Sequence, residues 1–210
     1  MKWVASLLPL FWGFTSVAQT NSWVSGVSGN WHDANSWSAG VLTGTNQTVL
    51  ITNENSKTVR IGADTALNYP ETLQVESVTV SAPNNSINTL LLDAALTNTP
   101  FSTAGLNIGE GGILAVLGTF SQWSGIRIAG SVMQGGVSDV TVGDLELQNS
   151  GSYHLTNGVL RTAGQNIGSQ AAFNQHGGTN LCRSVGIDGI YDISGGELRA
   201  RFHHAVNSIV

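Results

Sequence analysis

The chain is poor in cysteine and in charged residues. Its 210 residues contain a single cysteine, Cys182, and 10% of them are charged, against about a quarter in an average globular protein. One cysteine excludes an intrachain disulfide and a cluster of thiolate metal ligands, and we expect it to be buried as a small apolar side chain. Lysine and arginine total 8 against 13 acids, and the formal net charge is −5. The sequence contains no basic patch, so nucleic acid and anionic membranes are poor partners.

A hydrophobic run of membrane-spanning length is also missing. The apolar stretch from Trp3 to Phe14 follows the positive Lys2 and precedes Ser16-Val-Ala18, which has the small-x-small pattern of a signal-peptidase site. This stretch is shorter than the roughly 20 residues that cross a bilayer. We therefore predict that residues 1–18 are a signal peptide, and that the mature chain is exported without inserting into the membrane.

The periodicity of an amphipathic helix is absent as well. Short runs rich in β-branched residues and leucine, at 47–52, 58–61, 73–80 and 88–92, alternate with turn-forming segments instead. An apolar content of 41% argues against disorder. We expect an all-β domain with little or no helix outside the signal peptide.

A short phrase that begins with an aromatic or small residue and closes on glycine recurs through the second half. The clear copies lie at 153–158, 173–178 and 191–196, and weaker copies lie at 120–125 and 131–136. Their closing glycines are separated by 11, 22, 20 and 18 residues. A repeat of about 20 residues with short strands and glycine corners is typical of a solenoid. We predict a right-handed parallel β-helix.

Stacked coils of such a solenoid place equivalent residues above one another. Tyr153, Phe173 and Tyr191 occupy the same repeat position, so we expect them to form an aromatic ladder. A second ladder is expected from Val159 or Leu160, followed by Leu181 and Leu198.

Residues 19–45 differ from the rest of the chain. Three of the six tryptophans, Trp23, Trp31 and Trp37, lie there among glycine, serine and asparagine. We interpret this segment as a Trp-rich N-terminal cap, and residues 46–210 as solenoid coils that are expected to continue beyond 210.

This order of segments resembles a group of bacterial exported repeat proteins. The resemblance rests on Trp31-His-Asp-Ala-Asn-Ser-Trp37, on Ile108-Gly-Glu-Gly-Gly112 and on the repeated glycine-closed phrases. Proteins of that group carry passenger-like parallel β-helix arrays with autotransporter-type or PEP-CTERM-type surface anchoring. The resemblance implies a bacterial protein that is secreted or held at the cell surface, and it supplies no catalytic residues.

The tryptophans are the first candidate ligand-binding residues. Exposed indoles stack on sugar rings, so Trp23, Trp31, Trp37 and Trp123 are candidates for binding a glycan. The alternative is that the first three fill the N-terminal end of the stack and that Trp123 covers a corner.

Acids beside the repeat strands are the second set of candidates. Parallel β-helix lyases use acids on one face with a nearby base, and Asp139, Asp144 and Asp188 with Arg161 or Arg183 are the residues available for such chemistry. The acids follow no calcium-loop spacing, so they are equally well explained as solvated corner residues. We expect no metal and no cofactor.

The sequence therefore favours a non-enzymatic, adhesin-like scaffold over an enzyme. We expect an exported surface or secreted module whose ligand is a polysaccharide or another cell-surface polymer. The alternative is a polysaccharide lyase or glycoside hydrolase on the same fold. A third interpretation is a stalk for a function encoded elsewhere.

Overall fold

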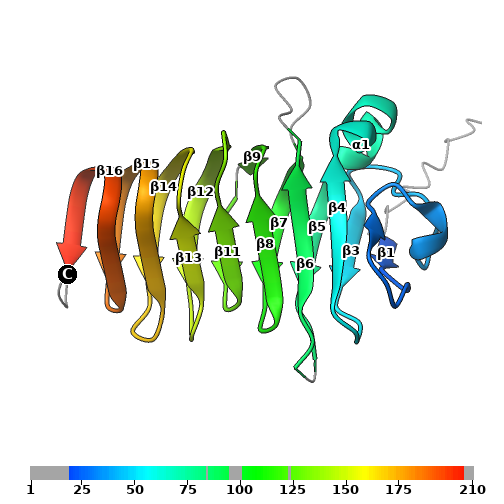
Figure 1. Cartoon of the computed structure of the whole chain (residues 1–210), viewed down its shortest axis with the longest axis horizontal. Coiled ribbons are helices and arrows are strands. Elements are labelled where there is room, and N and C mark those ends of the chain that lie inside the picture. The colour runs from blue at the N-terminus through cyan, green and yellow to red at the C-terminus, as the bar shows by residue number, and fades with distance from the viewer. Residues whose placement is uncertain (1–18, 84, 95–100, 123, 206–210) are drawn as a thin grey trace, which may run out of the picture.

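The chain forms one long parallel sheet. The computed structural model describes residues 19–83, 85–94, 101–122 and 124–205, and these residues build an all-β, solenoid-like array. Sixteen strands belong to a single sheet, and the paired strands run parallel to one another. In Figure 1 the coils follow one another along the long axis, from β1 at one end to β16 at the other. The prediction of an all-β chain with parallel strands is confirmed.

The strands fall into three columns, which we call sides one, two and three. Side one contains β2 (Gly29–Asn30), β4 (Lys57–Gly62), β6 (Asn88–Asp93), β8 (Gly112–Val116), β11 (Ser131–Gln134), β13 (Ser152–Leu155), and the first parts of β15 (Ala172–Ile187) and β16 (Ile190–Ala205). Side two contains β9 (Thr119–Gln122), the first halves of β12 (Asp139–Leu147) and β14 (Val159–Ile167), and the middle of β15 and β16. Side three contains β1 (Gln19–Ser22), β3 (Gln47–Ile51), β5 (Gln74–Val80), β7 (Ser102–Ile108), β10 (Ile126–Ile128), and the last parts of β12, β14, β15 and β16.

The burial pattern marks the corner between sides two and three. Along a strand every second residue faces inward. In β12 the buried positions are Val140 and Val142 and then, after a change of phase, Leu145 and Leu147. The strands β14 and β15 change phase at the equivalent places. One continuous strand therefore turns a corner and contributes to two sides of the array.

Three short helical segments interrupt the strands, and the sequence did not place any of them. Helix α1 (Ala63–Asn68) and the 3-10 turn η2 (Pro70–Leu73) link β4 on side one to β5 on side three, where later coils have a side-two strand. Another 3-10 turn, η1, spans Ala34–Ser36. Six residues are too few to display a 3.6-residue period, which is why α1 left no signal in the sequence.

The predicted aromatic ladder is confirmed. Tyr153 pairs with Phe173, which pairs with Tyr191, and all three side chains are buried. Their ring centroids lie 5.0 and 4.7 Å apart, with interplanar angles of 3° and 16°. The ladder therefore fills the interior of three successive coils.

The second predicted ladder was wrong at its middle position. Asn180, not Leu181, pairs with Leu160 on one side and Leu198 on the other, and the Asn180 side chain is buried. Leu181 lies on the outer face between Arg161 and Arg199. The inward position is the second residue after the closing glycine in each coil, and the apolar character of Leu181 does not override that register.

The two weaker repeats also lie out of phase with the clear ones. Phe120 pairs with Val140 on side two, so its phrase does not belong to the Tyr153 position. Val132, rather than Ser131, pairs with Tyr153. The glycine-closed phrase therefore occurs at more than one corner of the coil. The sequence spacing between its copies did not show which corner each copy occupies.

Candidate functional site

The tryptophans proposed as sugar platforms lie inside the molecule. Trp23, Trp31 and Trp37 are 1%, 0% and 4% exposed, and their rings make edge-to-face contacts at centroid distances of 4.9 and 5.3 Å. Each indole N–H donates to a backbone carbonyl within the protein. These three residues therefore offer no open ring face to a sugar. Trp123 lies outside the described residues.

The candidate acids and bases do not converge. Asp139 and Arg161 form an ion pair of 3.4 Å on side two, whereas Asp144 lies on side three. Asp188 is exposed just after the end of β15, and Arg183 is exposed at the corner between sides two and three. Among the residues that the structure describes, no cluster of three or more histidine, cysteine, aspartate or glutamate side chains could hold a metal ion.

Cys182 and Lys57 are buried titratable residues with structural surroundings. Cys182 is a free, buried cysteine, as predicted, and burial raises the pKa of its thiol. The Lys57 ammonium donates to the carbonyls of Asn53 and Glu54 and to Asn88 Oδ1, at 3.0, 2.6 and 2.9 Å. Because these contacts satisfy all three of its donors, Lys57 fastens a corner of the array rather than facing a ligand.

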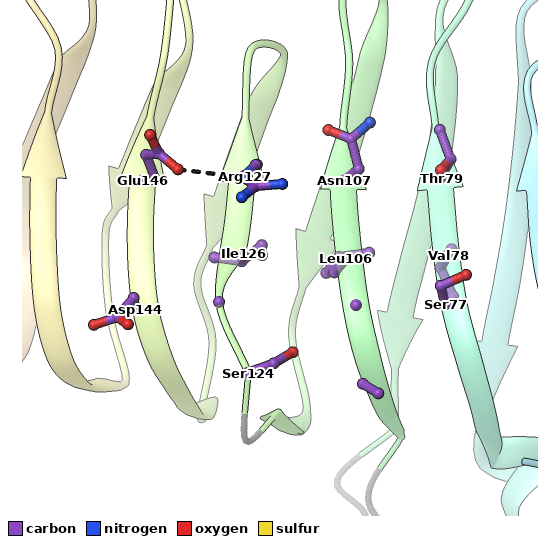
Figure 2. Close-up of a pocket in the computed structure, with 13 residues that line it drawn as sticks. Ser77, Val78, Thr79, Leu106, Asn107, Ser124, Ile126, Arg127, Asp144 and Glu146 are labelled. Carbon is purple, nitrogen blue, oxygen red and sulfur yellow. Dashed lines mark hydrogen bonds and ion pairs between the residues drawn. The ribbon is translucent and has the colours of Figure 1, made fainter.

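A groove with a volume of about 600 Å³ crosses the outside of side three over β5, β7, β10 and β12 (Figure 2). Its floor consists of small residues. Ser77 pairs with Gly105, and Gly125 precedes Ile126, which pairs with Leu106 in the adjoining position. Because Gly105 in β7 and Gly125 just before β10 carry no side chain, the surface is hollow there.

Polar side chains form one wall of the groove. Arg127 lies in register with Asn107 on one side and Glu146 on the other, and Figure 2 shows the three side by side. The Arg127 Nε–Glu146 Oε2 distance is 3.3 Å, and the other oxygen of Glu146 accepts from Gln148 Nε2 at 2.7 Å. An exposed pair of this kind contributes little to stability, so it can exchange its partner for a ligand at small cost.

The hollow extends toward the N-terminal ends of the side-three strands β5 and β7. A second depression of about 420 Å³ shares Ala104 and Ser124 with the groove and is bordered by Thr45, Gln74 and Glu76. Together the two depressions form an elongated, open channel that crosses several strands. Its lining offers hydroxyl, amide, guanidinium and carboxylate groups, which suit a hydroxyl-rich ligand.

Sequence reasoning found Asp144 but missed the rest of the groove. The floor residues Ser77, Gly105 and Gly125 lie in coils of unequal length, so no fixed period relates them. Arg127 and Glu146 are neighbours only because β10 and β12 pair in this register. Glycines at outward positions of neighbouring strands would have indicated the groove. Recognising that they are neighbours requires the register between strands, which the sequence does not show.

No family model matches the chain, and neither a curated protein nor a solved structure shows significant similarity to it. Within the described part of the chain, no helix has both the length and the apolar character to cross a membrane.

Proposed function

We propose that this protein is an exported, non-enzymatic, adhesin-like scaffold that binds a polysaccharide along the side-three groove. In this proposal residues 1–18 direct export, and the mature chain is secreted or displayed on a bacterial surface, as in the autotransporter-type and PEP-CTERM-type repeat proteins that the sequence resembles. The observation that carries the proposal is the groove itself, which is elongated and open, with a floor of glycine and serine and a row of polar and charged side chains along one wall.

The finer architecture belongs to the same proposal. We infer a right-handed β-helix, because connections between parallel strands of one sheet are right-handed in about 98% of cases. We also infer that residues 19–45 cap its N-terminal end. The packing of Trp31 against Phe101, with centroids 5.4 Å apart, and the bond from the Trp23 amide to the Leu50 carbonyl support that cap.

The arrangement of charges favours binding over cleavage. A lyase needs its acids and its base around one substrate, whereas Asp139, Asp144 and Asp188 face different parts of the surface. Beside the groove, the Glu146 carboxylate is engaged by Arg127 and Gln148. The Asp144 carboxylate leans toward Gly164 on the next coil, since its Oδ1 lies 2.8 Å from where a Cβ of Gly164 would stand.

One observation favours the alternative of a glycoside hydrolase. Asp144 and Glu146 lie two residues apart on the outward face of β12, which places their backbones about 7 Å apart. Hydrolases of this class separate their two carboxyls by roughly 5–9.5 Å. If the alternative holds, Asp144→Asn and Glu146→Gln abolish the release of reducing ends from a polysaccharide that the wild-type protein degrades.

Filling the groove tests the proposal. A Cβ at Gly105 would meet only Ser77 Cβ at 3.5 Å, an ordinary contact, so Gly105→Leu fills the floor without displacing the backbone. Gly186→Leu is the matched control, because Gly186 lies on the same side of the array, outside the groove, and its Cβ would also make only ordinary contacts. We expect Gly105→Leu alone to abolish retention of the protein in gels cast with soluble β-glucan, mannan or galactan.

Equal retention of the two leucine variants would contradict the groove as the binding site. Circular dichroism and the thermal midpoint of each variant establish that both are folded, so that a loss of retention reports on the groove.

A further inference from the structure

Four arginines lie together on the outside of side two and at its corner with side three, at the end of the array formed by β14, β15 and β16. Arg161 and Arg199 both pair with Leu181, which lies between them. Arg183 and Arg201 follow Cys182 and Ala200, which pair with each other. We call Arg161, Arg183, Arg199 and Arg201 the arginine face. It holds half of the 8 basic residues of the chain, although they are scattered over 41 residues of sequence.

The acids near this face compensate only half of its charge. Arg161 is paired with Asp139 at 3.4 Å, and Arg199 is paired with Glu197 at 2.6 Å. Arg183 and Arg201 are exposed and have no carboxylate partner among the described residues. The arginine face therefore carries a local surplus of positive charge on a protein whose formal net charge is −5.

The geometry repeats along the array. Arg183 and Arg201 lie at equivalent positions of successive coils, about 4.8 Å apart at the backbone, and Arg199 and Arg201 lie about 7 Å apart along β16. Like charges directly opposite each other on neighbouring strands destabilise a sheet. An anion placed between Arg183 and Arg201 removes this repulsion, and guanidinium groups bind carboxylates with two parallel hydrogen bonds.

We propose that the arginine face binds an acidic polysaccharide through the carboxylates of its uronic-acid units. A linear polymer with regularly spaced carboxylates matches arginines that recur from coil to coil on an open surface. Nucleic acid fits less well, because it requires many phosphate contacts and, for single strands, aromatic stacking platforms. The outward neighbours on this face include Val159, Thr179 and Leu181, none of which is aromatic.

The arginine face lies on β14, β15 and β16, whereas the side-three groove lies on β5, β7, β10 and β12, so the two proposals fail independently. The arginine face is tested with polygalacturonate as the acidic polymer, whereas the groove is tested with neutral polymers. Binding of polygalacturonate that survives Gly105→Leu, together with loss of neutral-polymer retention, assigns each ligand to its own surface.

The decisive comparison uses full-length wild-type protein and single-charge variants in calorimetric titrations with polygalacturonate. Arg183→Gln and Arg201→Gln each weaken binding about tenfold, because each removes one charge-assisted, bidentate contact. Arg60→Gln is the matched control: Arg60 is an exposed arginine on side one, paired with Asp93 at 2.7 Å, and its loss changes the net charge by the same amount. Its affinity for the polymer is expected to equal that of the wild type. Arg183→Lys keeps the positive charge but lacks the planar guanidinium that forms two parallel hydrogen bonds. Its affinity for polygalacturonate is therefore expected to lie between that of the wild type and that of Arg183→Gln.

Three outcomes would overturn the proposal. The first is an absence of binding to polygalacturonate at low salt. The second is an equal loss of affinity in Arg60→Gln and Arg183→Gln, which would indicate a general charge effect. The third is tighter binding of single-stranded DNA or of phosphatidylserine vesicles than of polygalacturonate, which would assign the arginine face to a different class of partner.

Discussion

Replacing Asn180 with leucine tests the register that places an amide inside the array. Asn180 Nδ2 donates to Tyr191 Oη at 2.6 Å and to Gln165 Oε1 at 3.2 Å, and its Oδ1 accepts from Gln165 Nε2 at 2.7 Å. Leucine has a similar volume but removes all three hydrogen bonds. Tyr191 keeps one long contact, of 3.5 Å, to Gln175. Gln165 keeps a bond from Nε2 to Thr162 but loses the partner of its carbonyl oxygen.

The size of the effect follows from these contacts. A buried hydrogen bond contributes about 1 kcal/mol net, so three lost bonds cost about 3 kcal/mol. The additional apolar surface of leucine returns about 1 kcal/mol. We therefore expect Asn180→Leu to lower the free energy of unfolding by about 2 kcal/mol. Leu181→Ala, which truncates a side chain on the outer face, is expected to cost less than about 1 kcal/mol.

Urea unfolding followed by circular dichroism measures both values. The slope of the free energy against urea concentration should be unchanged in either variant, which confirms that the same structure unfolds. The reasoning is refuted if Asn180→Leu stabilises the protein while Leu181→Ala destabilises it by 2 kcal/mol or more. That result would mean that Leu181 is the inward residue.

Three further predictions concern the interior and the pH dependence. Phe173→Ala should cost about 3–5 kcal/mol in urea unfolding, because the ring is fully buried between two stacked tyrosines; a loss near zero would contradict the ladder. Gly178→Ala should cost more than about 2 kcal/mol in the same assay, because φ is +68° and the added Cβ would stand 2.7 Å from the Gly158 carbonyl oxygen. A smaller loss than Gly105→Ala causes would contradict this. Burial, together with the nearby His176, lowers the pKa of His154 below 6.5 in the folded state. The unfolded chain therefore binds the proton first, so stability should fall as the pH drops through 6.5 and level off below the folded pKa. His154→Gln should flatten this slope, and an unchanged slope would show that other groups cause it.

The sequence predicted the repeating interior better than the surface. Tyr153, Phe173 and Tyr191 share one position of a repeat with regular length, and like residues stacked in register give a strong signal. Asn180 was missed because its amide is satisfied by Gln165 and Tyr191, which are distant in sequence. A buried amide cannot be told from an exposed one without knowing those partners.

The candidate sites were harder to predict, because each depends on the register between coils of unequal length. No basic patch was expected from the composition, yet pairing of β14, β15 and β16 gathers the four residues of the arginine face. The groove depends on residues that lack side chains, such as Gly105 and Gly125, and on the lengths of loops between strands. Tryptophans were candidates for ligand binding, with packing at the N-terminal end as the alternative, and Trp23, Trp31 and Trp37 are buried.

The most direct test of the account is to measure binding and cleavage of the same polymer by the wild-type protein. Retardation in gels cast with a soluble polysaccharide reports binding, and an assay of reducing and unsaturated ends on that polysaccharide reports cleavage. The account predicts retardation in at least one polymer, with no new chain ends after prolonged incubation. New chain ends, or free migration in every polymer, would contradict a polysaccharide-binding scaffold.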